Sequence, residues 1–135
     1  MNDYTLSTTL ERPYDDTVAD VRAALVDAGF GVLTEIDVRA TMKNKLDVDV
    51  PPQVILGACR PQLAHEAMSA EPSIAALLPC NVVVRSVDER HTVVEAIDPA
   101  AMMRVADNDA LDRVAEEVHE RLTGALGSLG AEAQG

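Results

Sequence analysis

The sequence is poor in aromatic and lysine side chains, with no Trp, one Phe, two Tyr and two Lys among its 135 residues. It contains no apolar run of the length of a membrane span, so we expect no membrane partner. The first residues carry neither basic charge nor an apolar stretch, which argues against a secretory signal and favours a cytoplasmic protein.

Several motifs that identify enzymes and metal sites are also missing. The sequence contains no G-x-S-x-G, P-loop or dinucleotide-binding fingerprint, so the commonest enzyme classes lack support and no cofactor is indicated. Its two cysteines do not form the C-x-x-C spacing of a zinc site. Whether the chain is an enzyme is therefore left open by its motifs.

The charge is strongly negative, with 11 basic and 23 acidic side chains and a formal net charge of -12. Nucleic acid is an unfavourable partner, because an acidic surface repels a polyanion over most of its area. Abundant Asp with scarce Lys is what we expect of a halophilic protein, in which salt screens the self-repulsion. Residues 38–65 run against this trend, with a formal charge of +2.

The length and the apolar fraction of 47% predict one folded domain over residues 1–135, with a flexible tail from about residue 127. Alternating or continuous apolar residues predict strands at Tyr4–Leu10, Phe30–Asp37, Val54–Cys59, Asn81–Val87 and Thr92–Ile97. Helical spacing predicts helices at Asp15–Ala28 with Asp15 as N-cap, at Val38–Leu46, at Pro61–Ala70, and at Leu111–Leu126 before Gly127 and Gly130.

The order of these elements predicts an α+β fold. The last two strands are joined by a short polar connection, residues 88–91, that suits a hairpin. A hairpin and long helices favour a mostly antiparallel sheet of about five strands with helices on one face, over a doubly wound parallel sheet.

Four ordered strings carry a family resemblance. They are FGVLTEIDV at 30–38, ILGACRP at 55–61, LLPCNV at 77–82 and IDP at 97–99. The chain resembles, over nearly its whole length, the bacterial and archaeal domain-of-unknown-function family numbered three hundred and two. The resemblance implies a small α+β domain of TATA-binding-protein-like topology, usually a homodimer, and it implies no activity and no DNA binding. The chain departs from the usual pattern at Arg60, where Asn is common, and at Met42, where Leu is common.

The two cysteines are the main candidates for chemistry. Cys59 ends an apolar strand just before Pro61 at a helix start, where free N–H groups and the helix dipole favour a thiolate. If the flanking strands are antiparallel, Cys59 and Cys80 lie at one rim of the sheet, with Asp98, Met102 and Met103 nearby. Cys59, Cys80 and Met102 could then bind a soft metal such as Cu(I).

Other interpretations of these sulfur residues remain open. A parallel crossover would separate the cysteines, and buried Cys and Met often serve only as core packing. A structural disulfide is a third possibility.

Two further groups could bind a ligand. Glu35 and Asp37 project to the same side of one predicted strand and could form a carboxylate pair, or could simply be hydrated. Lys43, with Arg39 and Lys45, could hold an anion, or could belong to a solvated helix face. The three histidines, at 65, 91 and 119, are scattered along the chain.

These patterns lead to one functional hypothesis with two alternatives. The first is a cytoplasmic homodimeric domain that binds a small molecule or soft metal at a site around Cys59 and Cys80. The second is a thiol-based redox or sulfur-transfer enzyme, with Cys59 as nucleophile and Cys80 as resolving thiol. The third is an interaction protein without a ligand, which pairs through an exposed sheet or helix face.

Overall fold

The computed structural model describes the backbone of residues 2–134 and the side chains of residues 2–129. The elements follow in the order β1 (Thr5–Leu10), α1 (Tyr14–Asp27), β2 (Gly31–Asp37), α2 (Val38–Leu46), β3 (Gln53–Cys59), α3 (Pro61–Ala70), the 3₁₀ helix η1 (Pro72–Leu77), β4 (Cys80–Ser86), β5 (Thr92–Ile97), α4 (Pro99–Ala106), the 3₁₀ helix η2 (Asp109–Leu111) and α5 (Asp112–Gln134).

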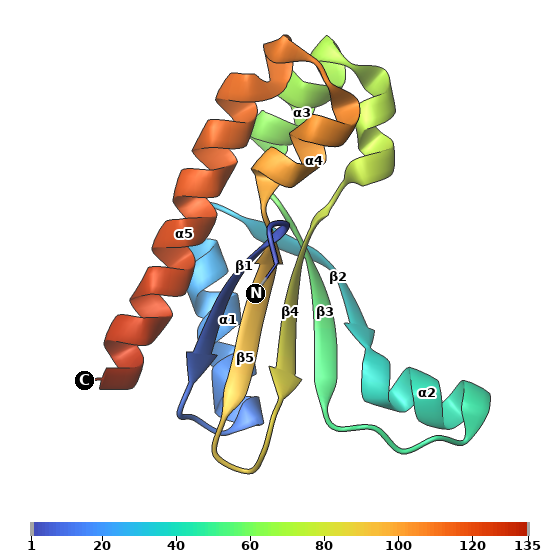
Figure 1. Ribbon diagram of the computed structural model, residues 1–135, viewed down its shortest axis with the longest axis vertical. Helices are drawn as coiled ribbons and strands as arrows, with labels where there is room; N and C mark the ends of the chain where they lie inside the picture. Colours follow the sequence, from blue (N-terminus) through green and yellow to red (C-terminus); the bar gives the residue numbers. More distant parts are fainter. Residues whose placement is uncertain (1, 135) are drawn as a thin grey trace.

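Within the described residues, five strands form one sheet in the order β1-β5-β4-β3-β2, and every neighbouring pair is antiparallel. The helices α1 and α5 lie side by side along one face of this sheet (Figure 1). The main core forms there, where Val82 and Val94 of the sheet meet Val21 of α1 and Leu122 of α5. The predicted α+β fold with a five-stranded antiparallel sheet is confirmed.

The remaining helices lie at the margins of the sheet. Figure 1 shows α3 and α4 together beyond one end of the strands, next to the upper part of α5. The end of β3, the start of β4 and the end of β5 meet at this rim, because the three strands are antiparallel neighbours. At the opposite end of the sheet α2 projects from the edge strand β2, and none of its nine residues, all of which are described, is buried.

Two predicted helix boundaries are corrected by the structure. The N-cap of α1 is Pro13, not Asp15, which lies in the first turn, where its charge still faces the positive end of the helix dipole. The last helix does not end before Gly127, since α5 continues to Gln134. A side chain at Gly127 would meet open space, so this glycine is an ordinary solvent-facing helix residue. The predicted tail extends to residue 135, which lies outside the described residues.

Helix α4 was not predicted, although its start carries a clear signal. The side chain of Asp98 accepts a hydrogen bond from the backbone N–H of Ala100 at 3.0 Å, and Pro99 occupies the first helical position. An acidic cap followed by Pro is a common helix start, because Pro has no N–H to leave unpaired there. This helix brings Met102 and Met103 to the rim.

No helix in the described part of the chain is both long enough and apolar enough to cross a membrane.

Candidate functional site

A cavity lies at the rim where the sheet ends, enclosed by α3, α4 and α5. The cavity has a volume of about 40 Å³, room for roughly three waters. Its lining is almost entirely apolar and is made by Phe30, Ala58, Cys59, Arg60, Leu63, Ala64, Ala67, Leu78, Pro79, Cys80, Pro99, Met102, Met103, Val114, Ala115 and Val118. We call it the rim cavity.

The antiparallel pairing of β3 with β4 brings both cysteines to this cavity. Cys80 lies opposite Ala58, one residue before Cys59. Because side chains alternate along a strand, the two thiols leave opposite faces of the sheet, and both border the rim cavity because the sheet ends there. Both cysteines are free; Cys80 is buried and Cys59 is half-buried.

Gly57 leaves room for two neighbouring side chains at this point. A Cβ atom built on Gly57 would lie 2.7 Å from Cγ of Pro79, and 2.1 Å from Oγ1 of Thr34. Such contacts are far shorter than packed atoms allow, so a larger residue at 57 would displace these side chains. Pro79, which directly precedes Cys80, therefore packs in the space that Gly57 leaves open near the end of β3.

The thiols are less acidic than the sequence predicts. Burial raises the pKa of the Cys59 thiol, and it raises the pKa of Cys80 to about 11, with a smaller contribution from neighbouring Cys59. The direction is opposite to the lowered pKa expected for Cys59 at a helix start, because burial disfavours the charged form of the thiol. Near neutral pH the rim cavity presents two neutral S–H groups.

The methionines of α4 add two more sulfur atoms to the same wall. Met102 is buried and Met103 is half-buried, and both line the rim cavity. Asp98 is not among the lining residues, although the sequence predicts it nearby; its carboxylate lies 3.4 Å from Nδ1 of His119. The chemistry of this wall is therefore apolar and polarisable, with four sulfur-bearing side chains.

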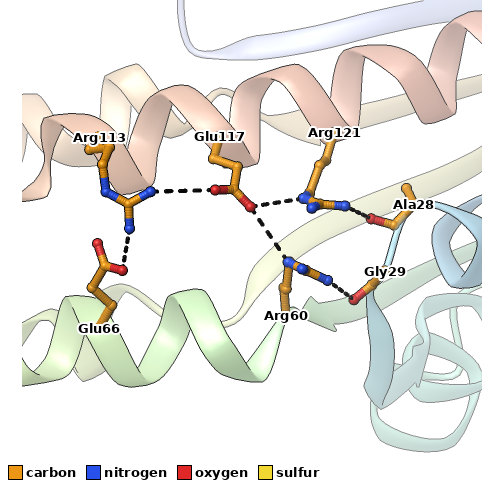
Figure 2. A network of polar contacts seen from close by, with 7 residues as sticks. All are labelled: Ala28, Gly29, Arg60, Glu66, Arg113, Glu117 and Arg121. Carbon is orange, nitrogen blue, oxygen red and sulfur yellow. Dashed lines mark hydrogen bonds and ion pairs between the residues drawn. The ribbon is translucent and has the colours of Figure 1, made fainter.

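A network of charged side chains flanks the cavity and joins three parts of the fold (Figure 2). Glu117 of α5 accepts hydrogen bonds from Arg121 at 3.1 Å and Arg113 at 3.5 Å. It also lies 3.6 Å from Nε of Arg60 at the start of α3. Arg121 donates to the carbonyl of Ala28, and Arg113 donates to Glu66.

Sequence reasoning missed this network, because its members are separated by up to 93 positions in the chain. The one local signal is the 113, 117, 121 spacing, which places Arg, Glu and Arg on one face of a helix.

The structure does not bring Glu35 and Lys43 to the rim cavity. Glu35 forms an ion pair with Arg22 of α1, and Asp37 caps α2 by accepting from the N–H of Ala40 at 2.9 Å. Lys43 lies 2.9 Å from a carboxylate oxygen of Asp47 and 3.5 Å from one of Asp49. A role of Glu35 or Lys43 in ligand binding stays a prediction.

Among the described residues, no group of three or more His, Cys, Asp or Glu side chains is placed to hold a metal ion. The predicted set of Cys59, Cys80 and Met102 borders one cavity but contains only two such residues. Any metal there would depend on thioether sulfur as well as on the thiols.

Comparison with known proteins identifies the family of the chain and a solved structure of similar fold. The model of the family described as "Domain of unknown function DUF302" matches residues 6–129. The crystal structure of an uncharacterized conserved DUF302 protein from Bacillus stearothermophilus superposes with a TM-score of 0.85. It is 24% identical, and the match covers 93% of this chain and 98% of that one, which establishes the shared fold. No curated protein matches the sequence.

The raised pKa of Cys80 predicts a loss of stability at high pH. The thiol ionises near pH 9.0 in the unfolded chain but only near pH 11 in the folded one. The stability that the neutral, buried Cys80 thiol contributes to the folded protein is therefore complete below pH 9 and is lost as the pH rises toward 11. We expect the free energy of unfolding, relative to Cys80→Ala, to fall by about 2 to 3 kcal/mol between pH 8 and pH 11. Urea unfolding of both proteins under reducing conditions measures this difference, and a pH-independent difference would contradict the assignment.

Proposed function

The chain belongs to the DUF302 family, and for this member we propose a binding function, in which the rim cavity holds a small, largely apolar ligand. The observation that carries the proposal is the cavity itself, an enclosed apolar space at the junction of the sheet with three helices. Cavities at such junctions, with few polar groups, are the usual places for small ligands.

The size and chemistry of the cavity define the ligand class. Room for about three waters corresponds to a body of about four to six non-hydrogen atoms. The neutral thiols of Cys59 and Cys80 and the thioethers of Met102 and Met103 offer polarisable contacts to it, and only weak hydrogen bonds. An apolar or soft group therefore fits this wall better than a strongly hydrated one.

A soft metal ion is the second candidate, and the observation that favours it is that four sulfur-containing residues line one cavity. Thiolate and thioether ligands select Cu(I), and binding would release the thiol protons of Cys59 and Cys80. Met102 would supply the third sulfur ligand of the Cu(I) ion. The raised pKa values of both thiols make proton release costly, so Cu(I) would bind more tightly as the pH rises.

The thiol-enzyme alternative has less support. A nucleophilic or resolving cysteine works as the thiolate, and enzymes lower the pKa of such thiols. Here burial raises the pKa of both cysteines.

We also propose that the domain is a homodimer and that α2 is part of the interface. An isolated helix of nine residues is marginal in water unless an apolar face is covered. Leu46, the last residue of α2, and Val48, two residues beyond it, are 65% and 44% exposed, and Leu33 and Ile36 on the adjoining edge strand are 65% and 48% exposed. A second copy is the favoured occupant, because the basic window 38–65 complements the acidity of the rest of the same chain.

The cavity proposal predicts that a small neutral molecule protects Cys59. We expect 1-butanol to slow alkylation of Cys59 by iodoacetamide, with the rate falling about twofold when the concentration equals the Kd. Ala115→Leu, which fills the cavity from α5, should abolish this saturable protection, and Ala23→Leu on the exposed face of α1 should not. The proposal would be contradicted if 1-butanol slowed alkylation of Cys59 equally in the wild type, Ala115→Leu and Ala23→Leu, without reaching saturation.

The metal candidate predicts retention of a single Cu(I) per chain against a chromogenic Cu(I) chelator, without oxygen. Cys59→Ser should abolish retention, and Met102→Leu should weaken it by about tenfold, or 1.4 kcal/mol. Met68→Leu is the matched control, because Met68 lies on α3 but does not line the cavity. Equal weakening by the two methionine substitutions, or no retention by the wild type, would exclude Cu(I).

The dimer proposal predicts that a charge on the exposed end of α2 separates the subunits. We expect light scattering to show a dimer for the wild type and a monomer for Leu46→Asp. Val105→Asp is the control, because Val105 is an equally apolar residue that is 74% exposed on α4. A wild-type monomer at 100 µM, or dissociation by both substitutions, would show that α2 does not hold a second copy.

A further inference from the structure

The rim cavity shares part of its wall with a groove between α4 and α5. Met103 of α4 and Ala115 of α5 line both spaces, so these two residues form the partition between them. The groove has a volume of about 530 Å³, far larger than the rim cavity. Because Ala115 has only a methyl group, the side chain of Met103 is the larger part of this partition.

The side chain of Met103 is free to move while its backbone stays in place. Met103 is half-buried, whereas Met102 beside it is buried, with an exposure of 7%. The carbonyl of Met103 accepts a hydrogen bond from the N–H of Asp107 at 2.8 Å, which holds the end of α4. An unbranched side chain with three rotatable bonds can change rotamer without a change in the backbone. Rotation of Met103 would therefore open the partition and leave α4 in position.

The groove beyond Met103 is acidic. Its titratable or charged lining residues are Arg104, Asp107, Asp109, Asp112, Glu116 and His119. With His119 neutral, four carboxylates and one guanidinium give a formal charge of -3. None of these four carboxylates forms an ion pair with a residue that the structure describes. A cleft lined by charges of one sign attracts ions of the opposite sign and repels ions of the same sign.

We propose that small molecules enter the rim cavity from this groove, past the side chain of Met103, and that the carboxylates of the groove select neutral and cationic molecules over anions. The inference rests on the proposed binding function and adds the route and the charge selection of the ligand. The groove acts on the approaching molecule, and its apolar body is held in the rim cavity. A cationic ligand would keep its charged group in the groove, where water and carboxylates surround it.

A second groove, along β4 and β5, also borders the rim cavity. The residues common to both linings are Pro79 and Met102. Pro79 has a closed ring and Met102 is buried, so this partition has less freedom to open than Met103. The two charged lining residues of the second groove, Arg85 and Glu95, form an ion pair with each other. Entry by the second groove would therefore show no charge selection, and an experiment can distinguish the two routes.

The test measures alkylation of Cys80 in the Cys59→Ser variant. Cys80 is buried and borders the rim cavity, so its thiol reports entry into that cavity. Iodoacetamide, iodoacetate and 2-bromoethylammonium are of similar size and are neutral, anionic and cationic. In each reaction the thiolate displaces the halide ion, a carbon–sulfur bond forms, and the thiol proton goes to the buffer. Each rate, measured at pH 8 and low ionic strength, is divided by the rate of the same reagent with 2-mercaptoethanol.

We expect iodoacetate to react about tenfold more slowly than iodoacetamide after this correction, and 2-bromoethylammonium to react at least as fast as iodoacetamide. Added salt should reduce the difference, because it screens the groove charges. Asp112→Asn/Glu116→Gln should reduce it to about threefold, because two of the four groove carboxylates are removed. Asp16→Asn/Asp27→Asn changes the total charge equally at exposed positions of α1, and this matched control should keep the tenfold difference.

The role of Met103 is tested by comparison with Met102 on the same helix. Met103→Ala should speed alkylation of Cys80 by all three reagents about tenfold, because the partition is removed. Met102→Ala should speed it less, although Met102 is more buried and its truncation costs more stability. Thermal unfolding of both variants measures that loss of stability and separates entry past Met103 from entry by unfolding.

Equal corrected rates for iodoacetate and iodoacetamide would overturn the route, as would no alkylation of Cys80 in the folded protein. An equal effect of the two double substitutions would assign the selection to the total charge of the chain and overturn the role of the groove. A larger acceleration by Met102→Ala than by Met103→Ala would overturn the role of Met103.

The binding function is tested separately, by NMR shift changes when 1-butanol is titrated into the same Cys59→Ser variant. Saturable binding of 1-butanol without charge selection overturns the route and leaves the cavity proposal standing. Charge selection without binding of 1-butanol overturns the cavity proposal and leaves a route by which reagents reach Cys80.

Discussion

The antiparallel pairing of β3 with β4 is the constraint on which the site depends. It returns the chain to the rim that it left at Cys59, so that Cys59 and Cys80, which are 21 positions apart in sequence, border one cavity. A parallel pairing would place the start of β4 at the far end of the sheet. Gly57 leaves room for the side chain of Pro79 beside the end of β3, and residues of α3, α4 and α5 complete the lining of the cavity.

Much of the fold can be predicted from the sequence, because local patterns and tertiary packing agree. The hairpin of β4 and β5 follows from two apolar runs with a short polar connection, and α5 follows from its stripe of leucine and valine. The errors occur where local signals compete. Asp15 looked like a cap because of its side chain, yet Pro13 lies two residues earlier with an extended backbone and ends the preceding segment.

The candidate site is only partly predictable. The meeting of Cys59 and Cys80 follows from strand direction, which the hairpin and the helix order already indicate. The Arg60 network does not, because Gly29, Arg60 and Glu117 come from three distant segments, and charged residues on helices usually point into solvent. Lys43 and Glu35 lie away from this cavity. Each finds a partner within the chain, and a sequence pattern does not show which charges are already paired.

The thiols and Arg60 show two different responses to burial at the rim. Desolvation disfavours the charged form of a buried group, and a thiol avoids this cost by keeping its proton. Arg60 stays charged and is held by partners within the protein, since its Nε lies 3.6 Å from Glu117 and its Nη1 donates to the carbonyl of Gly29. Arg113 and Arg121 share the same Glu117 carboxylate, so one acidic residue of α5 organises the charges beside the cavity. The rim therefore keeps its charges in a network along α5 and lines its cavity with neutral, polarisable groups, because only such groups can border an apolar space without a large cost of desolvation.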